Sequence, residues 1–228
     1  MKTVIVLLIS LVALLLAGCG PAEKAVVVDD IVAAAPDNVK LLFENDYVAV
    51  MKFTLPPQAK LPLHEGRPRL VYSLSDYKLQ YQPQGGTPEM KNFRTGDVHW
   101  HGPDTHAVAN IGPITAEYLT VIRKNANPTP GVTSDLAQLT PDKAKVIFEN
   151  QNAKVIEVSL EPGDKQPEHT AAGRLVYSLT PAKIRLTQGG ETTEEEHAAG
   201  DLHYHEGGAH SVENLSDQPI RFLIFEVM

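Results

Sequence analysis

Short runs of alternating apolar and polar residues dominate the chain, and turn residues separate them. Residues 48–55 alternate and stop at a pair of prolines, and residues 154–160 alternate more regularly before a Glu-Pro-Gly turn. This alternation predicts strands with one buried face, and the glycine pairs at 85–86 and 189–190 predict hairpins. No long segment has the helical period, although residues 134–139 are compatible with a short helix. The pattern predicts an all-β chain.

The same pattern occurs twice, which predicts two domains. Residues 36–74 align with residues 141–179 at an offset of 105, and after one deletion an offset of 104 holds through Asn214. A repeat of this length indicates a duplicated domain and not a short solenoid unit. We expect a tether, a first domain, a Pro- and Asn-rich linker and a second domain, over residues 19–35, 36–124, 125–138 and 139–228.

The N-terminus has the features of a secretory signal. A positive start is followed by an apolar run over residues 4–16, too short for an ordinary spanning helix. The run ends in Leu-Ala-Gly-Cys, which resembles the lipobox of bacterial lipoproteins. This resemblance implies a signal peptide over residues 1–18 and lipid on Cys19. The alternative is a plain signal peptide with an incidental cysteine, but Cys19 is the only cysteine and stands where the motif requires it.

Lipid on Cys19 would anchor the protein to the bilayer of the cell envelope. Gly20 follows in place of aspartate, which by resemblance to enterobacterial sorting favours the outer membrane, facing the periplasm, if the organism has one. A single cysteine leaves the mature chain without a disulfide, so its stability must come from its core. The net charge of -8 and the scattered lysines and arginines argue against a nucleic-acid partner.

Histidines recur at matched positions of the two halves, and this repetition indicates a function. A fold needs its apolar periodicity and its turns to repeat, but it does not need histidines to repeat. Imidazoles suit zinc, copper, iron and nickel. Eight of the nine histidines are matched, and they are the candidate metal ligands: His64, His99, His101 and His106 in the first half, and His169, His203, His205 and His210 in the second.

Each half resembles a cupin domain, and the chain resembles a two-domain bicupin. The second cupin motif runs from Gly-Asp through a strand and a turn to a histidine, with an asparagine four residues later. It is present twice with a loop one residue shorter than usual, as residues 96–97 with His106 and Asn110, and as residues 200–201 with His210 and Asn214. The resemblance implies two tandem double-stranded β-helix (jelly-roll) barrels.

The first cupin motif is degraded in both halves. It normally offers two histidines with one residue between them, then a glutamate, then a glycine. Only the second histidine is present, as His64 and His169, and the glutamate position holds Arg69 and Arg174. In metallated cupins the histidines and glutamate of this motif, with the histidine of the second motif, bind a divalent ion, usually iron, manganese, nickel or zinc. Two of those four ligands are present in each copy.

Two orientations of the paired histidines remain open. His99 and His101 share one side of a strand, as do His203 and His205. If that side is the barrel interior, each domain can assemble three or four imidazoles around a metal. If the interleaved apolar residues point inward instead, the histidines line the surface between the domains or lie in solvent. Apolar residues usually occupy the interior, which favours the second orientation; presence in both copies favours the first.

The two arginines present a second pair of alternatives. An inward Arg69 or Arg174 would repel a bare cation and could hold a carboxylate or phosphate in a bidentate pair. Otherwise each is a surface arginine at the start of a strand. Asp97 and Asp201 are interpreted as turn residues. The Glu194–196 run with His197 has no counterpart in the first half, so we expect a solvated loop there.

The sequence therefore predicts an envelope lipoprotein of bicupin type that binds a divalent metal (zinc, iron, manganese, nickel or copper) through its repeated histidines, with or without a small molecule. One alternative is a metal-free module that binds a small anionic ligand through Arg69 and Arg174. Another is a purely structural envelope protein. No catalytic acid or base stands out, and Ser73 and Ser178 lack the flanking glycines of a nucleophile elbow, so no reaction is assigned.

Overall fold

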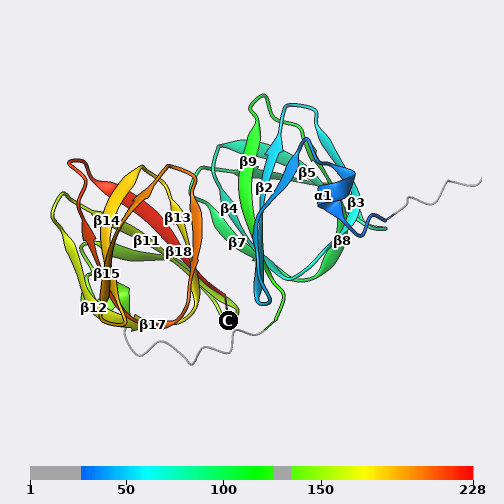
Figure 1. Cartoon of the computed structure of the whole chain (residues 1–228). Coiled ribbons are helices and arrows are strands. Elements are labelled where there is room, and N and C mark those ends of the chain that lie inside the picture. Colours follow the sequence, from blue (N-terminus) through cyan, green and yellow to red (C-terminus); the bar gives the residue numbers. More distant parts are fainter. Residues whose placement is uncertain (1–26, 126–134, 228) are drawn as a thin grey trace, which may run out of the picture.

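The computed structural model describes residues 27–125 and 135–227, which form two β-barrels (Figure 1). Each barrel consists of a five-stranded and a four-stranded antiparallel sheet. The strand orders are β1-β2-β9-β4-β7 with β3-β8-β5-β6 in the first barrel, and β10-β11-β18-β13-β16 with β12-β17-β14-β15 in the second. The two orders are the same once the strands are renumbered. The predicted pair of all-β jelly-roll barrels is confirmed.

The strands of both barrels are short. The first barrel contains β1 (Val39–Glu44), β2 (Val48–Leu55), β3 (Lys60–Gly66), β4 (Arg69–Ser73), β5 (Tyr77–Pro83), β6 (Glu89–Phe93), β7 (Val98–His101), β8 (Asp104–Asn110) and β9 (Ala116–Arg123). The second contains β10 (Ala144–Glu149), β11 (Ala153–Leu160), β12 (Lys165–Ala171), β13 (Arg174–Ser178), β14 (Ala182–Gln188), β15 (Glu191–His197), β16 (Leu202–His205), β17 (Gly208–Asn214) and β18 (Ile220–Val227).

A one-turn helix precedes each barrel. These are α1 (Ile31–Ala34) and α2 (Leu136–Leu139), and each is capped by an aspartate side chain, which accepts two backbone N–H groups in α1 and one in α2. The second helix confirms the expected short helix near residue 136. The two helices are 105 residues apart, so the duplicated unit begins at the capping aspartates, before residue 36.

The described end of the predicted tether packs onto the first barrel. Val28 forms a parallel bridge with His64 of β3, and its N–H donates to the Leu63 carbonyl at 2.8 Å. Ile31 of α1 is buried in the apolar core between the two sheets of that barrel. Residues 27–35 are therefore part of the first barrel. The predicted signal peptide, Cys19 and most of the predicted linker lie outside the described residues.

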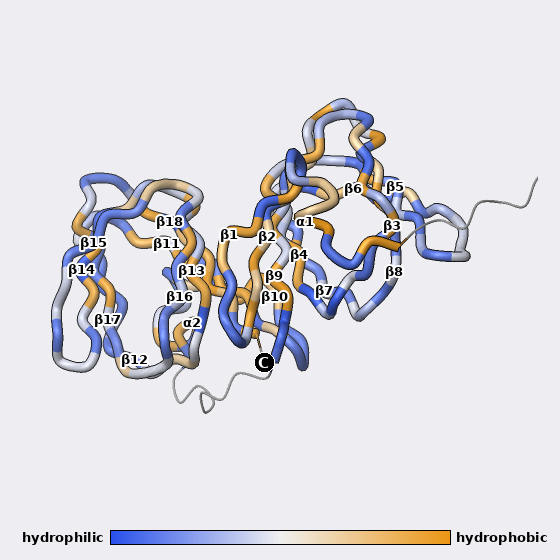
Figure 2. The backbone as a smooth tube through the Cα atoms, turned by 45° about the vertical axis from the view of Figure 1, so that its right-hand side comes forward, coloured by the Kyte–Doolittle hydropathy of each residue, from blue (hydrophilic) through white to orange (hydrophobic). Residues whose placement is uncertain are grey.

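The two five-stranded sheets pack against each other through their outer faces. A single apolar cluster joins Val50, Leu70 and Val121 of the first barrel to residues such as Leu175 and Phe225 of the second, all at most 1% exposed. In Figure 2 the apolar segments of β2, β9 and β10 run where the barrels meet. The five-stranded sheets are thus covered on both faces, which explains why every residue of β4 is buried.

This packing decides how the paired histidines face. Val98 and Trp100 of β7 pack on the cluster between the barrels, and so do Leu202 and Tyr204 of β16. Because side chains alternate along a strand, the histidines between and after them point into the barrels. Of the two orientations left open by the sequence, the one with the histidines in the barrel interior is present, since a second apolar face lies outside each barrel.

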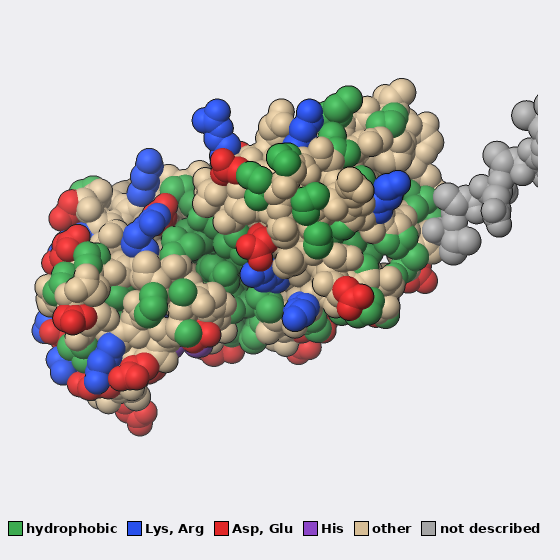
Figure 3. All heavy atoms as spheres, turned by 90° about the horizontal axis from the view of Figure 1, so that it is seen from above, with side chains coloured by type: hydrophobic (Ala, Val, Ile, Leu, Met, Phe, Trp, Pro, Cys, Tyr) green, Lys and Arg blue, Asp and Glu red, His purple; other side chains and the backbone are tan. Residues whose placement is uncertain are grey.

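The surface shows no concentration of one charge on the face in Figure 3, where lysines, arginines and acidic residues are interspersed. Many of them form exposed ion pairs, such as Lys52 with Glu117 at 3.1 Å. Within the described ranges, no helix has the length and apolarity needed to cross a bilayer.

Candidate functional site

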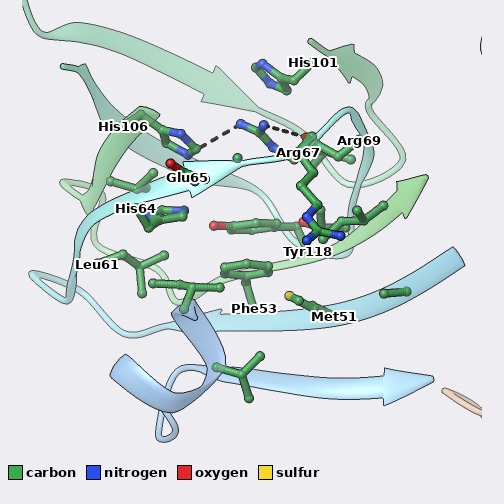
Figure 4. A pocket seen from close by; sticks show the side chains of 18 of the residues that line it. Met51, Phe53, Leu61, His64, Glu65, Arg67, Arg69, His101, His106 and Tyr118 are labelled. Carbon is green, nitrogen blue, oxygen red and sulfur yellow. Dashed lines mark hydrogen bonds between the residues drawn. The ribbon is translucent and has the colours of Figure 1, made fainter. Parts of the chain in front are cut away.

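The first barrel encloses a cavity of about 490 Å³ between its two sheets (Figure 4). Apolar and aromatic side chains from both sheets form most of its wall, and polar side chains from β3, β4, β5, β7 and β8 form the rest. The apolar wall includes Met51, Phe53, Leu61, Val71, Phe93 and Tyr118, and the polar wall includes His64, Arg69, Tyr81, His99, His101 and His106. All four predicted histidines of this half therefore face one cavity.

His64 and His106 lie side by side because their strands pair in register. They are directly opposite each other on β3 and β8, and their ring centroids are 4.4 Å apart. Nδ1 of His64 donates to the Pro62 carbonyl at 2.8 Å, since a carbonyl can only accept. In the neutral ring, Nε2 of His64 is then an acceptor.

His99 and His101 come from β7, opposite Val71 and Arg69 of β4. Their ring centroids are 4.8 Å apart, and the ring of His99 stacks on Phe93 at 4.9 Å. The turn before this strand contains Gly96 at φ 90°, a backbone angle that favours glycine, and Asp97, which accepts the Arg94 N–H at 2.7 Å. Asp97 is a turn residue, as predicted from the sequence.

Arg69 is buried and already paired within the protein. Its guanidinium donates to both carboxylate oxygens of Asp104, at 2.9 and 3.1 Å. The Tyr81 hydroxyl donates to the same carboxylate at 2.5 Å, and Nδ1 of His106 lies 3.0 Å from it. Burial by itself raises the pKa of Asp104, but His106, Arg69 and Tyr81 around its oxygens hold that pKa well below its usual range. Of the two alternatives for Arg69, the inward orientation is present, and its bidentate partner is a side chain of the same barrel.

Three of the cavity imidazoles, those of His64, His99 and His101, are neutral near pH 7. Burial lowers the pKa of His64 and of His99 to about 4 and that of His101 to about 3. The positive charge of Arg69 lowers all three further, and Lys91 does the same for His99 and His101. A neutral imidazole offers one donor and one acceptor, so the cavity wall combines hydrogen-bonding groups with a positive electrostatic field.

The second barrel repeats the histidines but has different residues around them. Strand register places Leu186 at the position of Tyr81, Gly208 at that of Asp104 and His197 at that of Phe93. The space beside its histidines is about 40 Å³, because apolar side chains of β13, β14, β17 and β18 fill most of the interior.

Arg174 has no carboxylate partner within ion-pair distance in the described chain. Its Nη2 donates to Nε2 of His210 at 2.8 Å, and its buried Nη1 finds no hydrogen-bond partner there. The side chain is 4% exposed, and burial lowers its pKa to about 10. With glycine at position 208 where the first barrel has aspartate, Arg174 is a buried, incompletely satisfied arginine.

The residues at the metal positions of the cupin motifs do not fit a cation. Nε2 of His210 accepts a hydrogen bond from Arg174, so its lone pair is not available to a metal. Nη2 of Arg69 similarly lies 3.5 Å from Nε2 of His106. A guanidinium beside the motif histidine would also repel a divalent ion.

The predicted sets of four imidazoles are not gathered around one point. Across residues 27–125 and 135–227, ligand atoms of three His, Cys, Asp or Glu residues lie within 4.8 Å of one another at one place, formed by His197, Asp201 and His203. Of these, His203 alone was a predicted metal ligand.

The expectation of a solvated loop around His197 is wrong. Residues 191–197 form strand β15, in which Glu194 and Glu196 point outward to ion pairs with Arg185 and Lys183 at 2.9 and 3.4 Å. Alternation turns His197 toward the barrel, where its ring centroid is 4.1 Å from that of His203. The alignment of His197 with Phe93 is the signal that could have identified it.

No protein-family profile matches the chain, and no curated protein matches it by sequence. Solved structures match the chain in fold. AerE from Microcystis aeruginosa superposes with a TM-score of 0.61 at 16% identity, covering 84% of this chain and 93% of that one. Oxalate decarboxylase from Lactobacillus farciminis, described as a formate complex, gives 0.59 at 13% identity over 79% and 77%. The Bacillus subtilis oxalate decarboxylase, described with Mn(II) centres, gives 0.57 at 15% identity over 82% and 71%. These similarities establish the two-domain cupin fold.

Proposed function

We propose that the first barrel binds a small organic anion with an apolar body in its cavity. The observation that supports this most strongly is the composition of the cavity wall. Neutral imidazoles in the positive field of Arg69 lie opposite an aromatic and aliphatic surface, in a space of about 490 Å³. This volume lies within the range of small-molecule sites. A purely structural barrel would have no need of such a cavity.

The two sides of the cavity have separate roles in this proposal. Phe53, Leu61 and Tyr118 receive the apolar body, which leaves water when it binds. The N–H groups of His99 and His101 donate to the oxyanion, and Nε2 of His64 accepts from a hydroxyl or amine of the ligand. Arg69 acts through its field and not as a direct clamp, because Asp104 already holds both of its outer nitrogens.

Titration calorimetry with 4-hydroxyphenylacetate, compared with its neutral amide, tests the proposal. We expect the carboxylate to bind more tightly than the amide, and we expect His101→Gln to weaken its binding by about 10- to 100-fold, since a hydrogen bond to a charged group contributes about 1.5–3 kcal/mol. His205→Gln makes the same change in the second barrel and should leave the affinity unchanged. Equal binding of acid and amide, or equal effects of the two variants, would contradict the proposal.

Divalent-metal binding is the other function expected from the histidines. It has no support at the motif positions, because Arg69 and Arg174 lie against the motif histidines there. The oxalate decarboxylase described with Mn(II) centres shares the fold with this chain at 15% identity.

We also propose that the protein is a lipid-anchored component of the cell envelope. The support is the apolar run ending in Leu-Ala-Gly-Cys. Metabolic labelling with a radioactive fatty acid should label the full chain and leave the Cys19→Ser variant unlabelled. Label that persists in the variant would contradict lipidation at this residue.

A further inference from the structure

We propose that the second barrel contains a binding site for a divalent transition metal, formed by His197, Asp201 and His203. This inference goes beyond ligand binding in the first barrel and does not depend on it. The three residues come from the end of β15, the following turn and the start of β16. One ligand atom of each lies within 4.8 Å of the others.

The side chains are held in place and still have free coordinating atoms. The ring centroids of His197 and His203 are 4.1 Å apart, and Nε2 of His203 is buried with no hydrogen-bond partner in the described chain. One carboxylate oxygen of Asp201 accepts the Ala198 N–H at 2.7 Å, which fixes the carboxylate beside the rings. A buried nitrogen without a partner is costly, and a metal ion would satisfy it.

The ligand types and spacing suit zinc or copper(II). Two imidazoles and a carboxylate form a common partial coordination shell for zinc, and metal–nitrogen bonds of about 2.0–2.1 Å place tetrahedral ligand atoms about 3.3 Å apart. The three residues are each partly exposed, so side-chain rotations can close the remaining distance. A carboxylate oxygen of Glu195 lies 3.3 Å from Nε2 of His197, which adds a second negative charge to balance a dication. Copper(II) and zinc bind such sites more tightly than manganese does.

The site is separate from the metal position of the cupin motifs. On β16, His205 pairs with Arg174 of β13, whereas His203 pairs with Val176. Two residues along a strand correspond to about 6.6 Å between backbone positions, so the proposed site lies beside the Arg174 position, and both line the same small space. The motif histidines His169 and His210 take no part in the site.

The first barrel shows what changes when one ligand is lost. Its equivalent residues are Phe93, Asp97 and His99, and Phe93 stacks on His99 where the second barrel has a pair of imidazoles. Lys91 stands at the position of Glu195, so the local charge is also reversed. The second barrel therefore has a ligand and a favourable charge at this end that the first barrel lacks.

Calorimetric titration of the chelator-treated full chain with ZnCl2, and with CoCl2 followed by visible absorption, tests the inference. We expect one zinc equivalent, and with cobalt the absorption bands of a nitrogen- and oxygen-coordinated ion. His197→Phe, which installs the residue of the first barrel, and His203→Gln should each weaken zinc binding at least 100-fold. His169→Gln, which changes a motif histidine, should leave it unchanged.

Thermal unfolding of each metal-free variant separates loss of the site from loss of the fold. Zinc should raise the unfolding temperature of the wild type and of the His169→Gln variant, and should not raise that of a folded His197→Phe variant. The inference is overturned if the wild type binds no zinc equivalent, if binding survives both His197→Phe and His203→Gln, or if His169→Gln abolishes it.

Discussion

Replacing each cavity arginine by methionine should have opposite effects in the two barrels. A pKa lowered from 12.5 to about 10 corresponds to about 3 kcal/mol of cost for keeping Arg174 charged at a site that is 4% exposed. Arg174→Met removes this cost, and it also removes one hydrogen bond to His210, worth about 1 kcal/mol. We therefore expect unchanged stability or a gain of up to about 2 kcal/mol.

Arg69→Met instead leaves Asp104 half-buried without its guanidinium partner. Breaking such a pair leaves an uncompensated charge and costs about 3 kcal/mol. Two of the carboxylate's neighbours, Tyr81 and His106, remain, and they limit the loss.

Urea unfolding followed by circular dichroism and by the fluorescence of Trp100 measures both effects. Trp100 is the only tryptophan and packs on the cluster between the barrels, so its emission reports on their separation. The unfolding midpoint should fall for Arg69→Met and should stay level or rise for Arg174→Met, with similar slopes. Equal losses of stability in the two variants would show that Asp104 does not distinguish the two arginines.

Three further outcomes are expected. The pKa of His64 is lowered from 6.5 to about 4 in the folded protein, so as the pH falls the unfolded chain is protonated at this residue before the folded protein is. The free energy of unfolding should therefore decrease between pH 6.5 and 4. Urea unfolding at a series of pH values measures it, and a value that stays constant over that range would contradict the prediction. Lys91→Glu combined with Phe93→His copies the second-barrel ligands into the first barrel and should raise bound zinc from one to two equivalents by calorimetry. Asn110→Ala removes two hydrogen bonds donated to the Leu55 and Ile114 carbonyls and one accepted from the Gly112 N–H, at 2.8–2.9 Å, and should cost about 3 kcal/mol in urea unfolding. Asn110→Asp should cost at least as much, because a buried carboxylate cannot donate and would set an oxygen against both carbonyls.

The fold could be predicted from the sequence because its signals are local and occur twice. Alternating strands, glycine turns and a cupin motif in each half specify two jelly rolls, and the structure has them. The repeat that is visible in the sequence starts at residue 36, whereas the repeated structure starts earlier. The capping aspartates Asp30 and Asp135 lie at the same offset of 105 and precede the two short helices.

The candidate site is only partly predictable from the sequence, because residues that match between the two halves reveal only what the two barrels share. The residues that make the barrels chemically different are those where the halves disagree. Asp104 opposite Gly208 decides whether the arginine is paired, and Phe93 opposite His197 decides whether a ligand is present. The arginine–aspartate pair between β4 and β8 exists in only one barrel, so residues that match between the two halves do not reveal it.

The orientation of the histidine side chains cannot be derived from one strand alone. Parity places His99 and His101 on one side of β7 and Val98 and Trp100 on the other, and a lone barrel would turn the apolar side inward. In a chain with two barrels, a second surface is buried from water besides the barrel interiors, at the contact between the two five-stranded sheets. Once the apolar side is buried there, the opposite side must line the interior, and only side chains that tolerate burial as neutral polar groups can occupy it. Imidazole does so because burial lowers its pKa below the working pH, whereas a lysine or a glutamate at the same place would remain charged or need a partner. The duplication thus explains both why apolar residues flank the histidines and why the histidines face the cavities.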